Sequence, residues 1–234
     1  MTQVKESDMH QLLKGLCVLA ISLLITSCAF NYPKLDAYED ELSADIYFVP
    51  IGLVAPEYLI SLADYYQENF NIKIGVTERL PIIKSAWNEE RRQLKSDYII
   101  WQMKYQYWNH SFNQDAVYIG ITHKDLYLPD DQAKPILAYR IGRNFAVVSN
   151  HRLEKTSDWN YLDIKETNSR FRKVVSKTIG TLHFDKPLNT NSKSVLYNNI
   201  KSLLDLDNID EKTIYSDILA QKPTELNLSA KNVY

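Results

Sequence analysis

Histidine serves catalysis and metal binding at neutral pH more widely than any other side chain, and this sequence contains five. Four of them follow residue 28: His110, His123, His151 and His183. No two lie three to five residues apart, the spacing at which two imidazoles on one helix reach the same metal ion. His123 directly follows an apolar run, a place where α/β proteins often carry active-site groups. We interpret all four as satisfied or solvated side chains, with acid–base chemistry as the alternative for His123 and His183.

Both cysteines lie within the first 28 residues. The apolar run over residues 16–25 is too short to span a bilayer as a helix, but it is typical of the core of a signal peptide. Residues 25–28, Ile-Thr-Ser-Cys, resemble the bacterial lipobox, whose cysteine is acylated and becomes the first residue after cleavage. We therefore predict a lipoprotein signal peptide over residues 1–27 and lipidation of Cys28. The alternative is a buried N-terminal helix that ends in a free thiol.

Lipidation would attach the protein to the bacterial cell envelope, with the lipid on Cys28 taking the place of a membrane-spanning helix. Ala29, and not an aspartate, follows this cysteine, which favours the outer membrane as the destination. Translation would start at Met1 or at Met9, where the signal would be more compact. No cysteine follows Cys28, so a disulfide, a thiolate zinc site and a cysteine nucleophile are excluded from the folded part of the chain.

The charge balance argues against nucleic acid as a partner, since 27 basic residues are offset by 29 acidic ones. Hydrophobic residues make up 45% and charged residues 24% of the sequence, which is the balance of a globular domain and not of a disordered chain. The chain has six glycines, and neither a dinucleotide-binding nor a P-loop glycine pattern occurs. A nucleotide-dependent enzyme is therefore not expected.

The pattern of apolar residues predicts one α/β domain over residues 45–220, between a lipidated tether over 28–44 and a flexible tail over 221–234. Strands are predicted at residues 46–49, 72–76, 116–122, 136–140 and 144–149. Helices are predicted at residues 56–70, 89–105, 166–183, 202–206 and 211–220, the last one capped by Asp210. The helix over 89–105 would bury the apolar residues that recur along it: Leu94, Tyr98, Trp101 and Tyr105. The early alternation of strands and helices indicates a mostly parallel sheet.

Several segments, in this order along the chain, resemble the archaemetzincins, a branch of the metzincin zinc peptidases. They are residues 46–52 (Ile-Tyr-Phe-Val-Pro-Ile-Gly), 80–81 (Leu-Pro) with 92–94 (Arg-Gln-Leu), 118–127 (Tyr-Ile-Gly-Ile-Thr-His-Lys-Asp-Leu-Tyr), 142–149 (Gly-Arg-Asn-Phe-Ala-Val-Val-Ser) with 152–153 (Arg-Leu), and 194–197 (Ser-Val-Leu-Tyr) with 202–207 (Ser-Leu-Leu-Asp-Leu-Asp). The resemblance covers about residues 45–210. It implies a metzincin-like mixed sheet packed with helices, in a single domain.

Zinc peptidases of this family use the motif His-Glu-x-x-His-x-x-Gly-x-x-His, in which three histidines bind zinc and the glutamate is the general base. When residues 179–180 are aligned with the aliphatic–glycine pair of the family, every functional position holds another residue. Lys177 replaces the first histidine, Thr178 the general base, Thr181 the second histidine, Phe184 the glycine and Pro187 the third histidine. Zinc and peptidase activity are expected from the family, but the ligands are absent, so we predict no metal, no cofactor and no catalytic residues.

The resemblance also points to the strand over residues 145–149, which consists of Phe145, Ala146, Val147, Val148 and Ser149. In active metzincins the corresponding edge strand holds the extended substrate through main-chain hydrogen bonds. Such pairing needs no particular side chain, so peptide binding would survive the loss of zinc. The alternative is an edge strand that is merely covered by a loop.

Three classes of function remain open. The preferred prediction is a membrane-anchored lipoprotein with a catalytically inactive archaemetzincin-like domain that binds a peptide or an envelope protein. The second is a divergent hydrolase, zinc-dependent or not, in which the fold brings His123, His183 and an acid together. The third is a purely structural component of the envelope. The replacements Lys177, Thr178 and Thr181 favour the first class.

Overall fold

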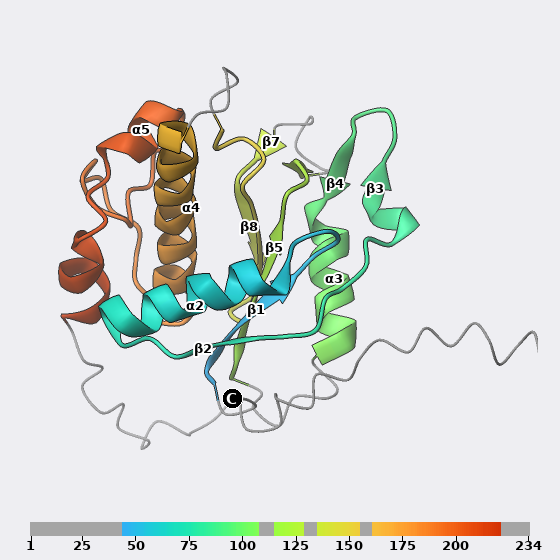
Figure 1. The fold of residues 1–234 in the computed structure, drawn as a ribbon, viewed down its shortest axis with the longest axis horizontal. Helices are drawn as coiled ribbons and strands as arrows, with labels where there is room; N and C mark the ends of the chain where they lie inside the picture. The colour runs from blue at the N-terminus through green and yellow to red at the C-terminus, as the bar shows by residue number, and fades with distance from the viewer. Residues whose placement is uncertain (1–43, 108–114, 129–134, 155–160, 221–234) are drawn as a thin grey trace, which may run out of the picture. The chain divides into compact units, whose positions relative to one another are not determined.

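The computed structural model describes residues 44–107, 115–128, 135–154 and 161–220 (Figure 1). These residues belong to one compact unit. The predicted signal peptide, the lipidation site Cys28, almost all of the tether, the C-terminal tail and His110 lie outside the described residues. In the described ranges no helix is both long enough and apolar enough to cross a membrane.

A mixed sheet runs through the centre of the unit, and five strands of the described chain form it in the order β2-β1-β5-β9-β8. The strands are β1 (Ile46–Pro50), β2 (Ile74–Val76), β5 (Val117–Thr122), β8 (Ala138–Ile141) and β9 (Phe145–Ser149). Four of them are parallel, and β8 pairs with β9 in the antiparallel sense. Strands β1, β5 and β9 are buried along their whole length, as expected for a parallel sheet covered on both faces. The predicted α/β fold with a mostly parallel sheet is confirmed.

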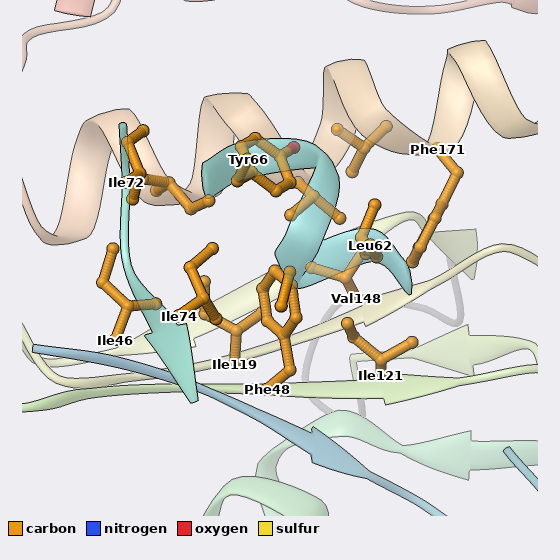
Figure 2. Close-up of a cluster of buried hydrophobic side chains, with 14 of the residues drawn as sticks. Ile46, Phe48, Leu62, Tyr66, Ile72, Ile74, Ile119, Ile121, Val148 and Phe171 are labelled. Atoms are coloured by element: carbon orange, nitrogen blue, oxygen red, sulfur yellow. The ribbon is translucent and has the colours of Figure 1, made fainter. Parts of the chain in front are cut away.

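Helices cover both faces of this sheet (Figure 1). They are α2 (Pro56–Phe70), α3 (Ser96–Tyr107), α4 (Tyr161–Leu182) and the shorter α5 (Leu203–Asn208), followed by the π-helical turn η3 (Tyr215–Leu219). Alternate residues of each strand enter different cores, because successive side chains of a strand point to opposite faces. Phe48 and Ile119 pack against α2 and α4, as Figure 2 shows, whereas Tyr47 and Tyr118 pack in the core that contains α3.

A second, small sheet occupies the region in which the helix over residues 89–105 was predicted to begin. In the described chain it consists of β3 (Trp87–Asn88), β4 (Gln93–Lys95), β6 (Leu126–Tyr127) and β7 (Pro135–Ile136), and the short 3₁₀ helix η2 (Lys84–Ala86) precedes it. The prediction of a helix over residues 89–95 is therefore wrong. Arg92 has a φ of 53°, which ends any helical run, and Leu94 donates its amide to the carbonyl of Asp125 at 2.8 Å. Pairing with a distant strand thus overrides the local helical pattern.

The packed side of α3 also differs from the prediction. Ile99, Ile100 and Met103 are fully buried, whereas Tyr98, Trp101 and Tyr105 are 40%, 61% and 80% exposed. The helix carries apolar side chains on two opposite sides, so periodicity alone could not identify the side that faces the sheet.

The other elements agree with the predictions apart from their ends. The strand predicted over residues 72–76 starts at Ile74, the one over 136–140 is divided between β7 and β8, and α4 starts five residues before the predicted position. Ser202 caps α5 in a capping box with Asp205. Asp210 accepts a hydrogen bond from the amide of Lys212 at 3.0 Å, as expected of a residue that precedes a helical turn.

Candidate functional site

Helix α4 carries three of the five residues that are aligned with the zinc-binding motif: Lys177, Thr178 and Thr181. It packs on the sheet through buried apolar residues, among them Phe171, Val175 and Ile179. Lys177 and Thr181 are four residues apart and therefore lie on one side of the helix. The helix thus retains the spacing that would place two metal ligands on one side. The contacts of these side chains decide whether they could bind an ion.

Lys177 connects α4 to the turn over residues 194–197. Its ammonium donates a hydrogen bond to the main-chain carbonyl of Tyr197. The side chain is half-buried, and this burial lowers the pKa of the lysine. A protonated ammonium has three donors and no lone pair, so it cannot coordinate a metal ion and it repels a dication. Lys177 therefore places a positively charged, hydrogen-bonded group at the position aligned with the first zinc ligand.

Both threonine hydroxyls are used within the helix. Thr178 is buried, and its hydroxyl donates to the carbonyl of Val174 at 2.9 Å. The hydroxyl of Thr181 donates to the carbonyl of Thr178 at 3.2 Å. Such bonds to the preceding turn are the usual way for a threonine to satisfy its hydroxyl inside a helix. Neither side chain offers a base or a good zinc ligand.

The chain turns shortly after the C-terminal end of α4. The helix ends at Leu182, and Asp185 takes the left-handed conformation with a φ of 49°. The amide of Lys186 then donates to the carbonyl of Gly180 at 2.9 Å. The chain therefore turns one residue after Phe184, which occupies the position of the family glycine, and Pro187 is exposed. In the described ranges, no three His, Cys, Asp or Glu side chains are grouped so that they could hold a metal ion.

The two histidines of the alternative hydrolase lie at opposite ends of the parallel strands. His123 follows β5, is exposed, and has its Nδ1 2.9 Å from Oδ1 of Asn150. His183 lies near Asp45, which precedes β1: burial lowers the pKa of His183, and the carboxylate of Asp45 raises it to a lesser extent. Since Asp45 is at the start of the parallel strands, six residues of β5 separate the two sites, about 20 Å. The structure does not bring His123 and His183 together.

Strand β9 is not an edge strand, contrary to the expectation for Phe145 to Ser149. It pairs with β5 on one side, from Tyr118↔Phe145 to Thr122↔Ser149, and with β8 on the other. All five residues, Phe145, Ala146, Val147, Val148 and Ser149, are buried. A peptide cannot pair with this strand without displacing a neighbouring strand. The prediction of a peptide-binding edge strand at residues 145–149 is therefore wrong.

The open edge beside α4 belongs to β8, which has β9 as its one partner among the described strands. The carbonyl of Leu137 accepts a hydrogen bond from the amide of Ser149 at 2.8 Å. Because main-chain groups alternate in direction along a strand, those of Ala138 and Arg140 are directed away from β9. The guanidinium of Arg140 reaches the carbonyl of Thr181 at 3.3 Å, so this edge lies next to the C-terminal end of α4. The sequence predicted a strand over residues 136–140 but not that β8 would be the edge of the sheet, because strand order depends on long-range pairing.

Two partly buried ion pairs, not predicted from the sequence, hold the segments that carry the family resemblance; the exposed partners are Arg152 at 44% and Asp207 at 37%. Asp125 accepts hydrogen bonds from Arg152 at 2.7 and 2.6 Å and from Gln93 at 2.6 Å. Burial opposes the ionisation of Asp125, but these bonds outweigh it and lower the pKa of the carboxyl group. Arg170, whose side chain is 1% exposed, makes two bonds to Asp207 at 2.7 and 2.8 Å. Both pairs are structural, since neither borders the motif positions of α4 in sequence or by contact.

No family model and no curated protein matches the chain. Three solved structures share its fold. An archaemetzincin from Archaeoglobus fulgidus, complexed with malonate, has a TM-score of 0.55 at 22% identity, over 74% of this chain and 99% of that chain. An archaemetzincin from Methanopyrus kandleri has a TM-score of 0.52 at 15% identity, over 73% and 92%. A zinc-dependent peptidase from Methanocorpusculum labreanum has a TM-score of 0.54 at 17% identity, over 72% and 97%. The chain therefore has the archaemetzincin fold, as predicted.

Proposed function

We propose that this protein is a lipid-anchored component of the bacterial cell envelope, at the outer membrane, whose archaemetzincin-like domain lacks peptidase activity and binds an extended peptide. The observation that carries the proposal is the hydrogen bond from the Lys177 ammonium to the carbonyl of Tyr197. It puts a positive group at the position aligned with the first zinc ligand. The residues at the motif positions thus do not fit zinc, in charge or in donor type.

The loss of zinc is tested by the metal content of the purified full-length chain. After dialysis against zinc and then against buffer, we expect less than about a tenth of an equivalent, because a stable site needs three or four protein ligands. Elemental analysis measures this directly. About one equivalent would overturn the proposal, because ligands outside the aligned positions would then have to converge on the ion.

The lipid anchor is supported by the sequence of residues 16–28 alone. We expect Cys28→Ser to abolish incorporation of an alkyne-tagged fatty acid and to leave the precursor uncleaved, since acylation of this thiol precedes cleavage of a lipoprotein signal. The matched control is Cys17→Ser, which removes the other cysteine and should retain the label. A Cys28→Ser chain that still carries fatty acid and runs at its mature size would refute the anchor.

Peptide binding is proposed at the open edge of β8. Strand addition relies on main-chain hydrogen bonds, and the amide of Ala138 is directed to this edge. We expect Ala138→Pro to weaken binding of the best peptide from a random nonapeptide pool about tenfold or more, because proline removes one donor and its ring obstructs the edge. Fluorescence anisotropy with the labelled peptide gives the Kd.

The control is Ala138→Ser, which keeps the main-chain donor and should leave the Kd unchanged. Both variants must show the melting temperature of the wild type, because the substituted amide does not face β9. Equal affinity in both variants would place the peptide elsewhere. A pool from which no peptide binds the wild-type chain would favour the purely structural role.

A further inference from the structure

The outward side of α3 carries an aromatic stripe, formed by Tyr98, Trp101 and Tyr105. These side chains are 40%, 61% and 80% exposed. At about 100° per residue, the three positions lie within about 60° of one another and roughly opposite the buried Ile99 and Met103. Three adjacent exposed aromatic rings are unusual on a monomer and are typical of a surface that binds a protein or a membrane.

Two lysines accompany the stripe. The Nζ of Lys95 is 4.8 Å from the ring centre of Tyr98, and that of Lys104 is 5.1 Å from the ring centre of Trp101. In the sequence of α3, Asp97 is the one acidic residue. Tyrosine and tryptophan have an apolar ring with a polar tip, and together with lysine they are the side chains that favour the boundary between lipid and water.

The chain enters the domain on the side of the sheet that α3 covers. Ala44 is 1% exposed and belongs to the same buried cluster as Ile99 and Met103. Its amide donates to the hydroxyl of Tyr47 at 3.2 Å. The ring of Tyr118 stacks on Tyr47 at 5.3 Å, and it also stacks on Tyr107, the last residue of α3, at 4.9 Å. The N-terminal segment therefore joins the domain near the C-terminal end of α3.

The segment from Cys28 to Ala44 can extend to about 55 Å at most. A lipid on Cys28 would therefore keep the α3 side of the domain within reach of the bilayer at all times. Because the domain is already tethered, contact between its α3 side and that bilayer is an intramolecular event. A surface of low intrinsic affinity, with a few aromatic contacts and two positive charges, is then enough for binding.

We propose that the aromatic stripe of α3 rests on the anionic lipid bilayer to which Cys28 is tethered, with Lys95 and Lys104 at the lipid phosphates. This inference rests on the proposed lipid anchor. It adds an orientation: because α3 and α4 cover opposite faces of the sheet, α4 is turned away from the bilayer. Helix α4 and the edge of β8 at Arg140 then face the aqueous phase and not the lipid.

The lipidated full-length chain has no cysteine other than the acylated Cys28 once its signal is removed, so one introduced thiol can be labelled selectively. We would compare Trp101→Cys with Leu204→Cys on α5, where the native side chain is 67% exposed. Each is labelled with an environment-sensitive dye and reconstituted in vesicles of phosphatidylethanolamine and phosphatidylglycerol that contain a spin-labelled lipid quencher. We expect strong quenching at position 101 and weak quenching at 204, and the difference should shrink when Lys95→Glu and Lys104→Glu are added.

Each other outcome overturns the inference in a recognisable way. Equal quenching at both positions on floated vesicles refutes the stripe and leaves the anchor intact. A dye at position 101 that neither the lipid quencher nor aqueous iodide reaches means that another part of the chain covers the stripe. A chain that does not float with the vesicles refutes the anchor, and with it the orientation. Circular dichroism of each variant checks that the exposed substitutions leave the fold unchanged.

Discussion

Replacement of Arg170 by methionine is expected to lower the free energy of unfolding by about 3 kcal/mol. The guanidinium is 1% exposed and donates to Asp207, to the carbonyl of Leu153 at 3.0 Å and to Glu166 at 3.2 Å. Methionine fills a similar volume but removes the guanidinium donors that Arg170 gives to the Asp207 carboxylate and the Leu153 carbonyl. Asp207 is 37% exposed, so water recovers part of the loss, which keeps the expected effect at the lower end for a broken buried pair.

Urea unfolding of the full-length chain measures this difference. The matched control is Lys165→Met, the same kind of change at an exposed position of α4, which should shift the free energy of unfolding by less than about 0.5 kcal/mol. An Arg170→Met chain as stable as the wild type would mean that hydrophobic packing compensates for the lost pair, as it does in some proteins. Arg170 would then serve to select the position of α5 and not to stabilise the domain.

The ion pairs explain why a family resemblance persists in a chain without the family motif. Gln93, Asp125 and Arg152 come from three of the segments that resemble archaemetzincins, and they meet around one buried carboxylate. Asp207, from the last segment, holds Arg170. Selection on folding would keep such residues whether or not zinc is bound, because a buried charge that loses its partner is costly. The residues that still resemble the family are thus those that stabilise the fold.

Local signals accounted for most of the fold. The apolar runs at 46–50 and 117–122 are strands, and Pro56 begins the helix that ends at Phe70, because each signal is complete within one segment. The failures in strand assignment involve long-range pairing. Residues 93–95 form a strand because β6, more than thirty residues later, pairs with them. Likewise, nothing within residues 145–149 tells how many strands flank them.

The candidate site was predictable to a similar extent. Spacing along one helix was enough to notice that the ligand positions hold Lys177, Thr178 and Thr181, since a helix places them without reference to the rest of the chain. The acceptor of the Lys177 ammonium could not be predicted, because Tyr197 lies twenty residues further on in an irregular turn. The open edge of β8 and its contact to Thr181 are likewise products of tertiary structure.

Restoration of the family motif is expected to create a zinc site. A chain with Lys177→His, Thr178→Glu, Thr181→His, Phe184→Gly and Pro187→His should bind about one equivalent of zinc, whereas the wild type should bind less than about a tenth. Two histidines four residues apart on α4 would share an ion, and the glycine permits the turn that returns the third histidine to it. Elemental analysis after dialysis, and titration against a chromophoric chelator, measure content and affinity.

The control carries alanine in place of the three new histidines and keeps the other two changes, so it lacks the lysine charge without gaining ligands. Zinc bound by the histidine variant and not by the control would mean that the scaffold still holds the geometry of a metzincin site, and that the side chains alone prevent binding. Two folded variants that both stay free of zinc would show that the turn at Asp185, one residue later than the family glycine, has moved the third ligand position away from α4. In that case the backbone itself has diverged, and reversal of the side chains cannot recover a peptidase.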